Sequence, residues 1–230
     1  MTDKPSGHQQ KLKDREAYGR VAMILGALAN PVRLEIVELL AQCERSVDAL
    51  AKKCKQPLKN VSHHLQKLHS AGMVDRRSEG RTVVYFLTDP SVATFWSQTR
   101  HFAEERLSGL ISRAGGEAPS IHGIDLNSDV LHQMLGDDEV TVIDVRPPEE
   151  FSAGHLPGAR SVPLESLKEK MEDFPKDRPV VAYCRGRYCL LAEIAVDVLE
   201  NSGFEAIRFA DGVIEWRDAG LHVERDNPRS

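Results

Sequence analysis

Three short apolar runs, separated by stretches of helical periodicity, constrain the second half of this chain most strongly. The apolar runs cover residues 141–145, 179–184 and 206–210, and the helical stretches cover about 164–174, 188–202 and 213–219. Strands that alternate with helices are typical of a parallel sheet, because each crossover between parallel strands needs a connection of helical length. The second half is therefore predicted to be an α/β domain with helices on both faces of its sheet.

The first half has a different pattern, which is mainly helical with one hairpin. The predicted helices cover residues 12–29, 31–42, 47–54, 58–72 and 91–113, and the predicted hairpin covers 73–88. Asn30 is an N-cap candidate before Pro31, and Ser46 can cap the third helix. Two short helices joined by a tight break and followed by a hairpin predict a winged helix-turn-helix, whose second helix enters the major groove of DNA.

The helix over 58–72 has the residues that a recognition helix needs. Val61, Leu65 and Leu68 recur at helical spacing and are expected to face the core. The polar residues between them are free to contact DNA. Lysine side chains neutralise phosphates, and amide or imidazole groups form hydrogen bonds with base edges. We expect DNA contacts from Lys59, Asn60, Ser62, His63, His64, Gln66 and Lys67, and from Arg77 and Arg81 of the hairpin. The alternative is a helical bundle whose polar face is only solvated.

The net charge of −5 conceals two halves of opposite sign. Residues 1–115 hold 18 lysines and arginines against 12 aspartates and glutamates, a balance of +6, whereas residues 116–230 hold 12 against 23, a balance of −11. Opposite signs indicate different partners for the two halves. The small, glycine-rich segment 114–120 is typical of a linker, so we predict a DNA-binding and dimerisation domain over 1–113 and a second domain over 121–230.

Composition and cysteine spacing indicate the compartment. The apolar run at 21–29 is far too short to span a bilayer, and the N-terminus lacks the basic-then-apolar pattern of a secretion signal. Four cysteines at irregular spacing do not form a disulfide framework in a chain of this size. We therefore expect a cytoplasmic protein with no membrane partner, no metal and no cofactor.

Residues 20–90 carry three specific motifs. They are Asn-Pro-x-Arg-Leu from Asn30, His-Leu-x-x-Leu from His64 and Gly-Arg-x-x-x-Tyr from Gly80. In these motifs the segment resembles the ArsR/SmtB family of repressors. The resemblance implies a homodimer, built through the helices at 12–29 and 91–113, that binds an inverted-repeat operator in double-stranded DNA and is released by an inducer.

The inducer is not evident from the first half. Metal-sensing relatives carry a cysteine pair that is missing here, and His101 with Glu104 supplies only one of the two ligand pairs that zinc-binding relatives use. Persulfide-sensing relatives carry one cysteine on the helix corresponding to 31–42 and one on the last helix, and this chain has neither. We read His101 and Glu104 as surface residues, and no role is assigned to Cys43 or Cys54.

The segment YCRGRYC, residues 183–189, is the candidate reactive site of the second half. Its first cysteine ends a buried strand, and parallel sheets bind ligands at the carboxyl ends of their strands. Loop N–H groups, a following helix N-terminus and two arginines favour a thiolate there, and the glycine permits a tight turn. We expect the site to consist of Cys184, Arg185, Gly186, Arg187, Tyr188 and Cys189. The alternative is an inert cysteine at the end of a strand.

Flanking motifs give this half a family resemblance. Asp-x-Arg begins at Asp144 and Gly-His-x-Pro-Gly-Ala begins at Gly154. Residues 211–220 match Gly-Gly-x-x-x-Trp-x-x-x-Gly except that Asp211 stands in place of the first glycine. Over about 120–225 the chain resembles a rhodanese domain. The resemblance implies that Cys184 accepts a sulfane sulfur from a small donor such as thiosulfate or a persulfide and passes it to a thiophilic acceptor. Asp144, Arg146, His155 and Gly158 fall in signature segments with structural roles.

Two further readings concern the same loop. Cys189 is expected in the first turn of a helix that resumes near Tyr188, where it either attacks a Cys184 persulfide, giving a disulfide and sulfide, or only packs. A phosphatase with the Cys-x5-Arg loop needs an arginine at the position of Leu190, so phosphate chemistry is not expected.

Together these patterns predict a sulfur-responsive repressor in which a persulfide on Cys184 modulates operator binding. One alternative is an active thiosulfate or persulfide sulfurtransferase whose DNA-binding domain answers another signal. A third reading makes the rhodanese domain an inactive binding module.

Overall fold

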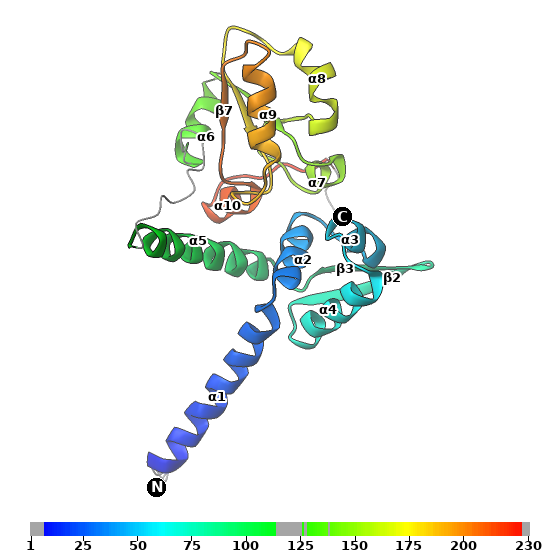
Figure 1. The fold of residues 1–230 in the computed structure, drawn as a ribbon, viewed down its shortest axis with the longest axis vertical. Helices are drawn as coiled ribbons and strands as arrows, with labels where there is room; N and C mark the ends of the chain where they lie inside the picture. The colour runs from blue at the N-terminus through cyan, green and yellow to red at the C-terminus, as the bar shows by residue number, and fades with distance from the viewer. Residues whose placement is uncertain (1–6, 114–125, 127, 138, 227–230) are drawn as a thin grey trace. The chain divides into compact units, whose positions relative to one another are not determined.

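The computed structural model describes residues 7–113, 126, 128–137 and 139–226, with only the backbone for 7–13 and 107–113. The chain divides into two compact units, residues 1–92 and 93–230 (Figure 1). The first is a helical unit with a hairpin and the second is an α/β unit, so the predicted fold classes are confirmed. The predicted linker at 114–120 lies outside the described residues.

The first unit has the helices and the hairpin that the sequence predicts, and the short strand β1 in addition. These elements are α1 (Gly7–Leu28), α2 (Pro31–Gln42), β1 (Arg45–Ser46), α3 (Val47–Lys53), α4 (Leu58–Ser70), β2 (Val74–Glu79) and β3 (Thr82–Leu87). The Asn30 side chain accepts hydrogen bonds from two backbone N–H groups at the start of α2, at 3.1 and 3.2 Å. Ser46 Oγ accepts one from Ala49 N–H at 3.2 Å. Both N-caps are therefore confirmed.

Helix α4 presents its apolar face to the core of the first unit. Val61, Leu65 and Leu68 are fully buried, as their spacing predicts. Strands β2 and β3 form an antiparallel hairpin, and β1 pairs with the other edge of β3. Strand β1 has only two residues, too few for periodicity to reveal it.

The second unit contains most of α5 (Pro90–Arg113), from Ala93 onwards, so the division at 113 stays a prediction. Its other elements are α6 (Ser128–Gly136), β4 (Thr141–Asp144), α7 (Pro148–Ala153), β5 (Arg160–Ser161), η1 (Leu164–Ser166), α8 (Leu167–Lys170), η2 (Met171–Asp173), β6 (Val180–Tyr183), α9 (Leu191–Glu200), β7 (Ala206–Arg208) and α10 (Val213–Asp218). The helix predicted at 164–174 is broken into η1, α8 and η2, and α6, α7 and β5 were not predicted.

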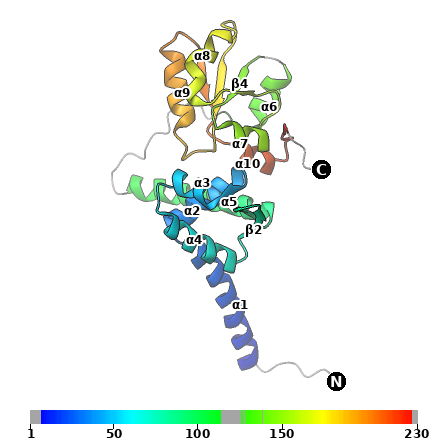
Figure 2. The ribbon, with the colours of Figure 1, turned by 90° about the vertical axis from the view of Figure 1, so that its right-hand side faces the viewer.

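The described strands of the second unit form one parallel sheet in the order β5-β4-β6-β7. Alternate residues of its central strands face opposite layers, because side chains along a strand alternate between the two faces. Val180 and Ala182 pack towards α8 and α9, whereas Val181 and Tyr183 pack towards α6 and Trp216 of α10 (Figure 2). This arrangement ends central strand β6 directly before Cys184.

The described helices were also compared with the length and apolar character that a bilayer crossing requires. None of them meets both conditions.

Candidate functional site

Cys184 follows β6 at the carboxyl edge of the parallel sheet and is only 1% exposed. Its sulfur lies 3.2 Å from the carbonyl oxygen of Cys189 and 3.8 Å from that of Gly186. The Cys189 N–H donates to the Gly186 carbonyl at 3.0 Å, which closes the loop as a tight turn. Gly186 has φ +128, a conformation that favours glycine.

Cys189 lies in this loop and not in a helical turn. Helix α9 begins at Leu191, after Leu190 as N-cap, so the prediction that the helix resumes near Tyr188 with Cys189 in its first turn is wrong. The reason is the turn between Gly186 and Cys189, which uses the backbone of these residues before the helix begins. The loop conformation instead brings the Cys189 thiol into hydrogen-bonding contact with Cys184. A resolving role for Cys189 stays a prediction.

The two thiols share a cradle of backbone N–H groups. Those of Gly186 and Ala192 donate towards the Cys184 sulfur, and those of Arg185 and Leu191 donate towards the Cys189 sulfur. Backbone N–H groups that converge in this way bind anions. The loop therefore offers N–H donors to both sulfurs, and its role in holding a thiolate or a persulfide anion stays a prediction.

A hydrogen bond between the two thiols couples the titration of Cys184 to that of Cys189. The hydrogen bond from Cys184 lowers the pKa of Cys189 to about 6. The same hydrogen bond, followed by burial, raises the pKa of Cys184 well above its usual value. The pair thus loses its first proton easily, and this differs from the expectation that Cys184 is itself the resting thiolate. Cys189 is then placed to accept the Cys184 proton.

The two loop arginines are bound by carboxylates. Arg185 donates to both oxygens of the fully buried Glu150, at 2.8 and 2.7 Å. Arg187 Nε lies 3.4 Å from Asp211 and 4.0 Å from Glu104. Their charges are therefore largely neutralised, and they fix the loop more than they attract anions. Glu150 was not predicted as a site residue because it lies 35 positions from Arg185 in the sequence.

Tyr188 and Leu190 point away from the cradle. Their side chains are 60% and 61% exposed. The sulfur-binding part of the loop is thus formed by backbone N–H groups and the two cysteines, and Tyr188 is brought to the rim of the site rather than into it.

The signature residues outside the loop make contacts that stabilise the fold. Asp144 and Arg146 form a buried ion pair with a 2.9 Å hydrogen bond, and Arg146 also donates to the Gly154 carbonyl at 2.7 Å. The His155 ring stacks on Phe151 with 3.7 Å between centroids. These buried groups are paired, as buried polar groups must be.

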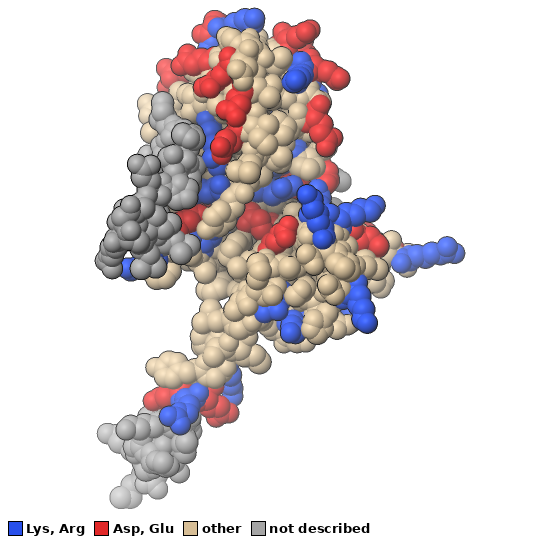
Figure 3. Space-filling view, in the orientation of Figure 1, with Lys and Arg blue, Asp and Glu red and all other residues tan. Residues whose placement is uncertain are grey.

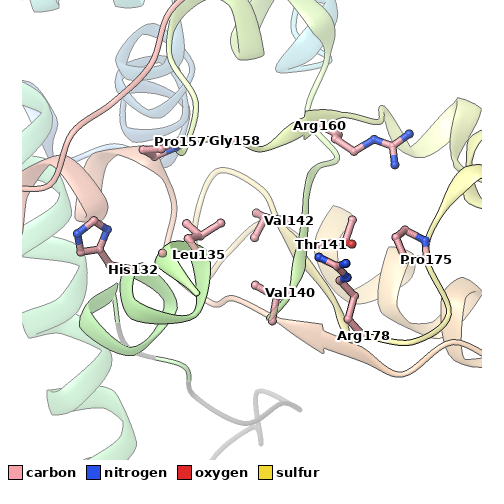
Figure 4. Close-up of a pocket in the computed structure, with 11 residues that line it drawn as sticks. His132, Leu135, Val140, Thr141, Val142, Pro157, Gly158, Arg160, Pro175 and Arg178 are labelled. Carbon is pink, nitrogen blue, oxygen red and sulfur yellow. The ribbon is translucent and has the colours of Figure 1, made fainter. Parts of the chain in front are cut away.

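A cavity of the second unit lies away from the cysteine loop. Its volume is about 470 Å³, and it opens near Val140 and Thr141 at the amino end of β4, with Arg160 and Arg178 at its rim (Figure 4). Cys184 follows the carboxyl end of β6, so this cavity is at the opposite edge of the sheet and does not belong to the sulfur site.

The predicted DNA-contacting residues of α4 differ in exposure. Exposed side chains are Lys59, Asn60, His63, Gln66 and Lys67. Ser62 and His64 are half-buried, and His64 Nδ1 has no hydrogen-bond partner among the described residues. Burial and then the Arg33 charge lower the pKa of His64, so its imidazole is neutral near pH 7.

The hairpin arginines also differ. Arg77 pairs with Glu44 and Glu79, and these hydrogen bonds raise its pKa above the usual value. Arg81 is exposed at the turn between β2 and β3. Figure 3 shows a basic side chain projecting from the hairpin tip and acidic side chains over the visible face of the second unit.

Other candidate residues remain outside the site. Burial and then Glu35 raise the pKa of Cys54 to about 11, and Cys43 is a half-buried free thiol. His101 lies 3.6 Å from Glu105, whereas Glu104 faces Arg187. Among the described residues, no group of three or more histidine, cysteine or acidic side chains has a metal-binding arrangement.

The fold and site define a winged helix-turn-helix unit joined to a rhodanese-like unit with a cysteine loop. Residues 28–77 match the family described as "Helix-turn-helix domain", and residues 127–219 match "Rhodanese-like domain". The protein "HTH-type transcriptional regulator Rv0324" of Mycobacterium tuberculosis is 39% identical over 217 residues, which are 94% of this chain and 96% of that protein. The chain belongs to this family of HTH-type transcriptional regulators with a rhodanese-like domain.

Two further comparisons concern the separate halves. A sulfurtransferase of Allochromatium vinosum is 32% identical over 100 residues, covering 43% of this chain and 92% of that protein. The homodimeric winged helix-turn-helix DNA-binding domain Mb0332 of Mycobacterium bovis, a possible ArsR-family regulator, is 36% identical, with a TM-score of 0.40. The matched region covers 46% of this chain and 94% of the Mb0332 structure.

Proposed function

We propose that this protein is a sulfur-responsive repressor in which a persulfide on Cys184 modulates operator binding. The observation that carries the proposal is the pair of thiols in one N–H cradle, within a chain of the HTH-type regulator family. A thiolate that forms near neutral pH is the reactive form of cysteine. A reactive sulfur site in a transcriptional regulator has an evident use as a sensor.

The loading step needs only the two cysteines and the donor. The Cys189 thiolate accepts the Cys184 proton, and the Cys184 thiolate attacks the outer sulfur of thiosulfate. The sulfur–sulfur bond of the donor breaks, sulfite leaves with the bonding electron pair, and the sulfane sulfur remains as a Cys184 persulfide anion. Backbone N–H groups of Gly186 and Ala192 face the sulfur of Cys184 and stabilise negative charge there.

The proposed regulator acts as a homodimer. Helix α1 exposes large apolar side chains, including Tyr18 at 73% and Met23 at 60%, and α5 exposes Phe95 and Phe102. Contiguous exposed apolar groups on a helix indicate an interface, and we propose that a second copy of the chain covers them. Two copies would present two α4 helices to an inverted repeat in double-stranded DNA, in the cytoplasm.

Operator binding with and without thiosulfate tests the proposal. A duplex is first selected from a random-sequence pool, in parallel by the reduced and by the thiosulfate-treated protein, and its affinity is measured by fluorescence anisotropy. We expect the affinity of the native protein to change on treatment and that of Cys184→Ser to stay constant. An equal change in both proteins would overturn the proposal.

A second assay distinguishes the sulfurtransferase alternative from the sulfur-responsive repressor. Thiosulfate-to-cyanide sulfur transfer that depends on Cys184, with an operator affinity that thiosulfate leaves unchanged, would identify the protein as an enzyme whose DNA-binding unit answers another signal. The 32% identity to a sulfurtransferase is the observation that keeps this alternative under test.

A further inference from the structure

Helix α5 contacts the Cys184 loop inside the second unit. Arg100 of α5 is only 4% exposed, and its guanidinium group lies against Gly186. A Cβ atom built on Gly186 would be 2.8 Å from Arg100 Nη2 and 3.2 Å from Nη1. This approach is possible because residue 186 has no side chain. The second residue after the reactive cysteine is thus in direct contact with an arginine on another helix.

Glu215 of α10 holds Arg100 in this position. Its carboxylate forms an ion pair with Arg100 and accepts a 2.8 Å hydrogen bond from Ser97 Oγ, one turn earlier on α5. The same carboxylate accepts the Gly212 N–H at 2.9 Å. Glu215 therefore ties α5 to the turn that precedes α10.

Gly212, whose N–H binds Glu215, also contacts the backbone of Cys184 and Arg185. A Cβ atom built on Gly212 would be 2.9 Å from the Cys184 carbonyl oxygen and 2.8 Å from that of Arg185. The backbone of the loop thus packs directly on the turn that Glu215 caps. Arg100 reaches the loop in two ways, through Gly186 and through Glu215 with Gly212.

The residues after Gly186 face the same helix. Arg187 lies 4.0 Å from Glu104 of α5, and the Tyr188 ring centroid lies 5.9 Å from the Arg100 guanidinium carbon. Beside this contact, a cavity of about 260 Å³ lies between α5 and Arg187 and includes Gln98 and His101 in its lining. The part of the loop at Arg187 therefore has space next to α5, whereas Gly186 is in contact with it.

We infer that Arg100 is the positioning residue through which the sulfur state of Cys184 acts on α5. This inference rests on the proposed function. A persulfide adds one sulfur atom and a negative charge to a closed loop in which Gly186 supplies one of the cradle N–H groups. Gly186 must adjust to the larger group, and its other side is the guanidinium of Arg100. The added charge also competes with Glu215 for this guanidinium.

Helix α5 is suited to transmit such a change. It begins at Pro90, three residues after the end of β3, so the chain continues from the hairpin directly into the helix that senses the loop. Its exposed Phe95 and Phe102 are part of the surface that we propose for the second copy. A displacement of α5 by the loop would thus alter dimer geometry and the spacing of the two recognition helices.

The test compares Arg100→Gln with Arg100→Lys and His101→Ala. His101 lines the same cavity but pairs with Glu105 of its own helix, so it is the matched control. Each protein is treated with thiosulfate, persulfide formation on Cys184 is measured by mass spectrometry, and operator affinity is measured by anisotropy. We expect every variant to load Cys184. The affinity change should persist in His101→Ala, fall by about fivefold or more in Arg100→Gln, and recover in part in Arg100→Lys.

The outcomes separate the inference from the proposed function. A full affinity change in a loaded Arg100→Gln protein would overturn the inference and leave the sulfur-responsive regulator intact. If the loaded native protein shows no affinity change, the proposed function fails, and hydrogen exchange decides the inference. Persulfide loading of Cys184 should then alter the amide hydrogen exchange of residues 93–106 in the native protein but not in Arg100→Gln. If loading leaves the exchange of these residues unaltered in the native protein, the inference is refuted. If Arg100→Gln does not fold, Glu215→Gln replaces it, since an amide oxygen still accepts the Gly212 N–H but no longer pairs with the charge.

Discussion

The guanidinium group of Arg185 binds both carboxylate oxygens of Glu150, at 2.7 and 2.8 Å, and Glu150 is fully buried. This contact fixes the residue after Cys184 to α7. Bidentate pairs of this kind combine strength with directional specificity. The position of the cysteine loop therefore depends on a carboxylate that itself never reaches the sulfur.

Glu150→Gln is predicted to destabilise the second unit, because it leaves the Arg185 charge without its buried partner. Breaking a buried ion pair costs about 3–5 kcal/mol. Thermal melting should therefore show a lower transition temperature, and the proposed loading of Cys184 by thiosulfate should become slower. Glu172→Gln, at an exposed position on η2, is the control and should leave both unchanged. Equal stability of the two variants would mean that the Arg185–Glu150 pair does not hold the loop.

The hydrogen bond between the two cysteines predicts how the rate of persulfide formation depends on pH. In the native protein the rate of persulfide formation should rise as pH increases through about 6, the pKa of Cys189, because the thiolate that receives the Cys184 proton forms there. Cys189→Ala removes this acceptor and leaves Cys184 buried, so the profile moves to higher pH. At pH 7 the rate should fall about tenfold for each unit of displacement. The rate of persulfide formation can be measured by stopped flow as a function of pH in the native protein and in Cys189→Ala. Identical pH profiles of the two proteins would exclude a proton-accepting role for Cys189.

Much of the architecture was predictable because it depends on local patterns. The apolar spacing of Val61, Leu65 and Leu68 located α4 and its buried face, and Asn30 located the start of α2. The strand that ends at Cys184 was evident from its continuous apolar run, which is typical of a strand buried on both faces. Elements of two residues, such as β1, carry no such pattern.

The parts of the site that the sequence did not reveal depend on contacts between distant residues. Nothing near Arg185 in the chain indicates Glu150, and nothing near Gly186 indicates Arg100. Position 189 was misplaced for a different reason, since the onset of a helix varies by several residues and is determined here by the turn that Gly186 forms. Sequence patterns located the candidate loop, whereas contacts with distant residues such as Glu150 and Arg100 determine how it is held.

The four cysteines are predicted to differ widely in reactivity. Because the pKa of Cys54 is raised to about 11, its thiolate is about one part in ten thousand at pH 7, whereas Cys189 is mostly ionised. Iodoacetamide under native conditions should therefore label Cys189 first and Cys54 last, as followed by peptide mass spectrometry. The same labelling after denaturation provides the control, in which all four should react at similar rates. Rapid native labelling of Cys54 would contradict its assignment as a structural thiol.

Gly212 is predicted to be essential for the loop because of its close backbone contacts. A Cβ atom there would be 2.8 to 2.9 Å from carbonyl oxygens that cannot rotate away, so Gly212→Ala must displace the loop. We expect Cys184-dependent sulfur transfer to fall by about tenfold or more, which corresponds to at least about 1.4 kcal/mol in the barrier. Gly136→Ala is the matched control, since nothing lies within 4 Å of a Cβ atom at that position. Equal activity of both variants would disprove the contact.

The exposed lysines of α4 are predicted to control the salt dependence of DNA binding. Each phosphate contact releases condensed counterions, so the loss of one lysine contact reduces the slope of log affinity against log salt by about 0.9. Lys67→Ala should show this decrease on any duplex, whereas Lys168→Ala, an exposed lysine on α8 of the second unit, should retain the native slope. Arg77→Ala should have a smaller effect than Lys67→Ala, because Glu44 and Glu79 already neutralise the Arg77 guanidinium. Anisotropy titrations at several salt concentrations provide the slopes. An unaltered slope in Lys67→Ala would mean that the exposed face of α4 does not contact the phosphate backbone, and the role of α4 as the recognition helix would have to be abandoned.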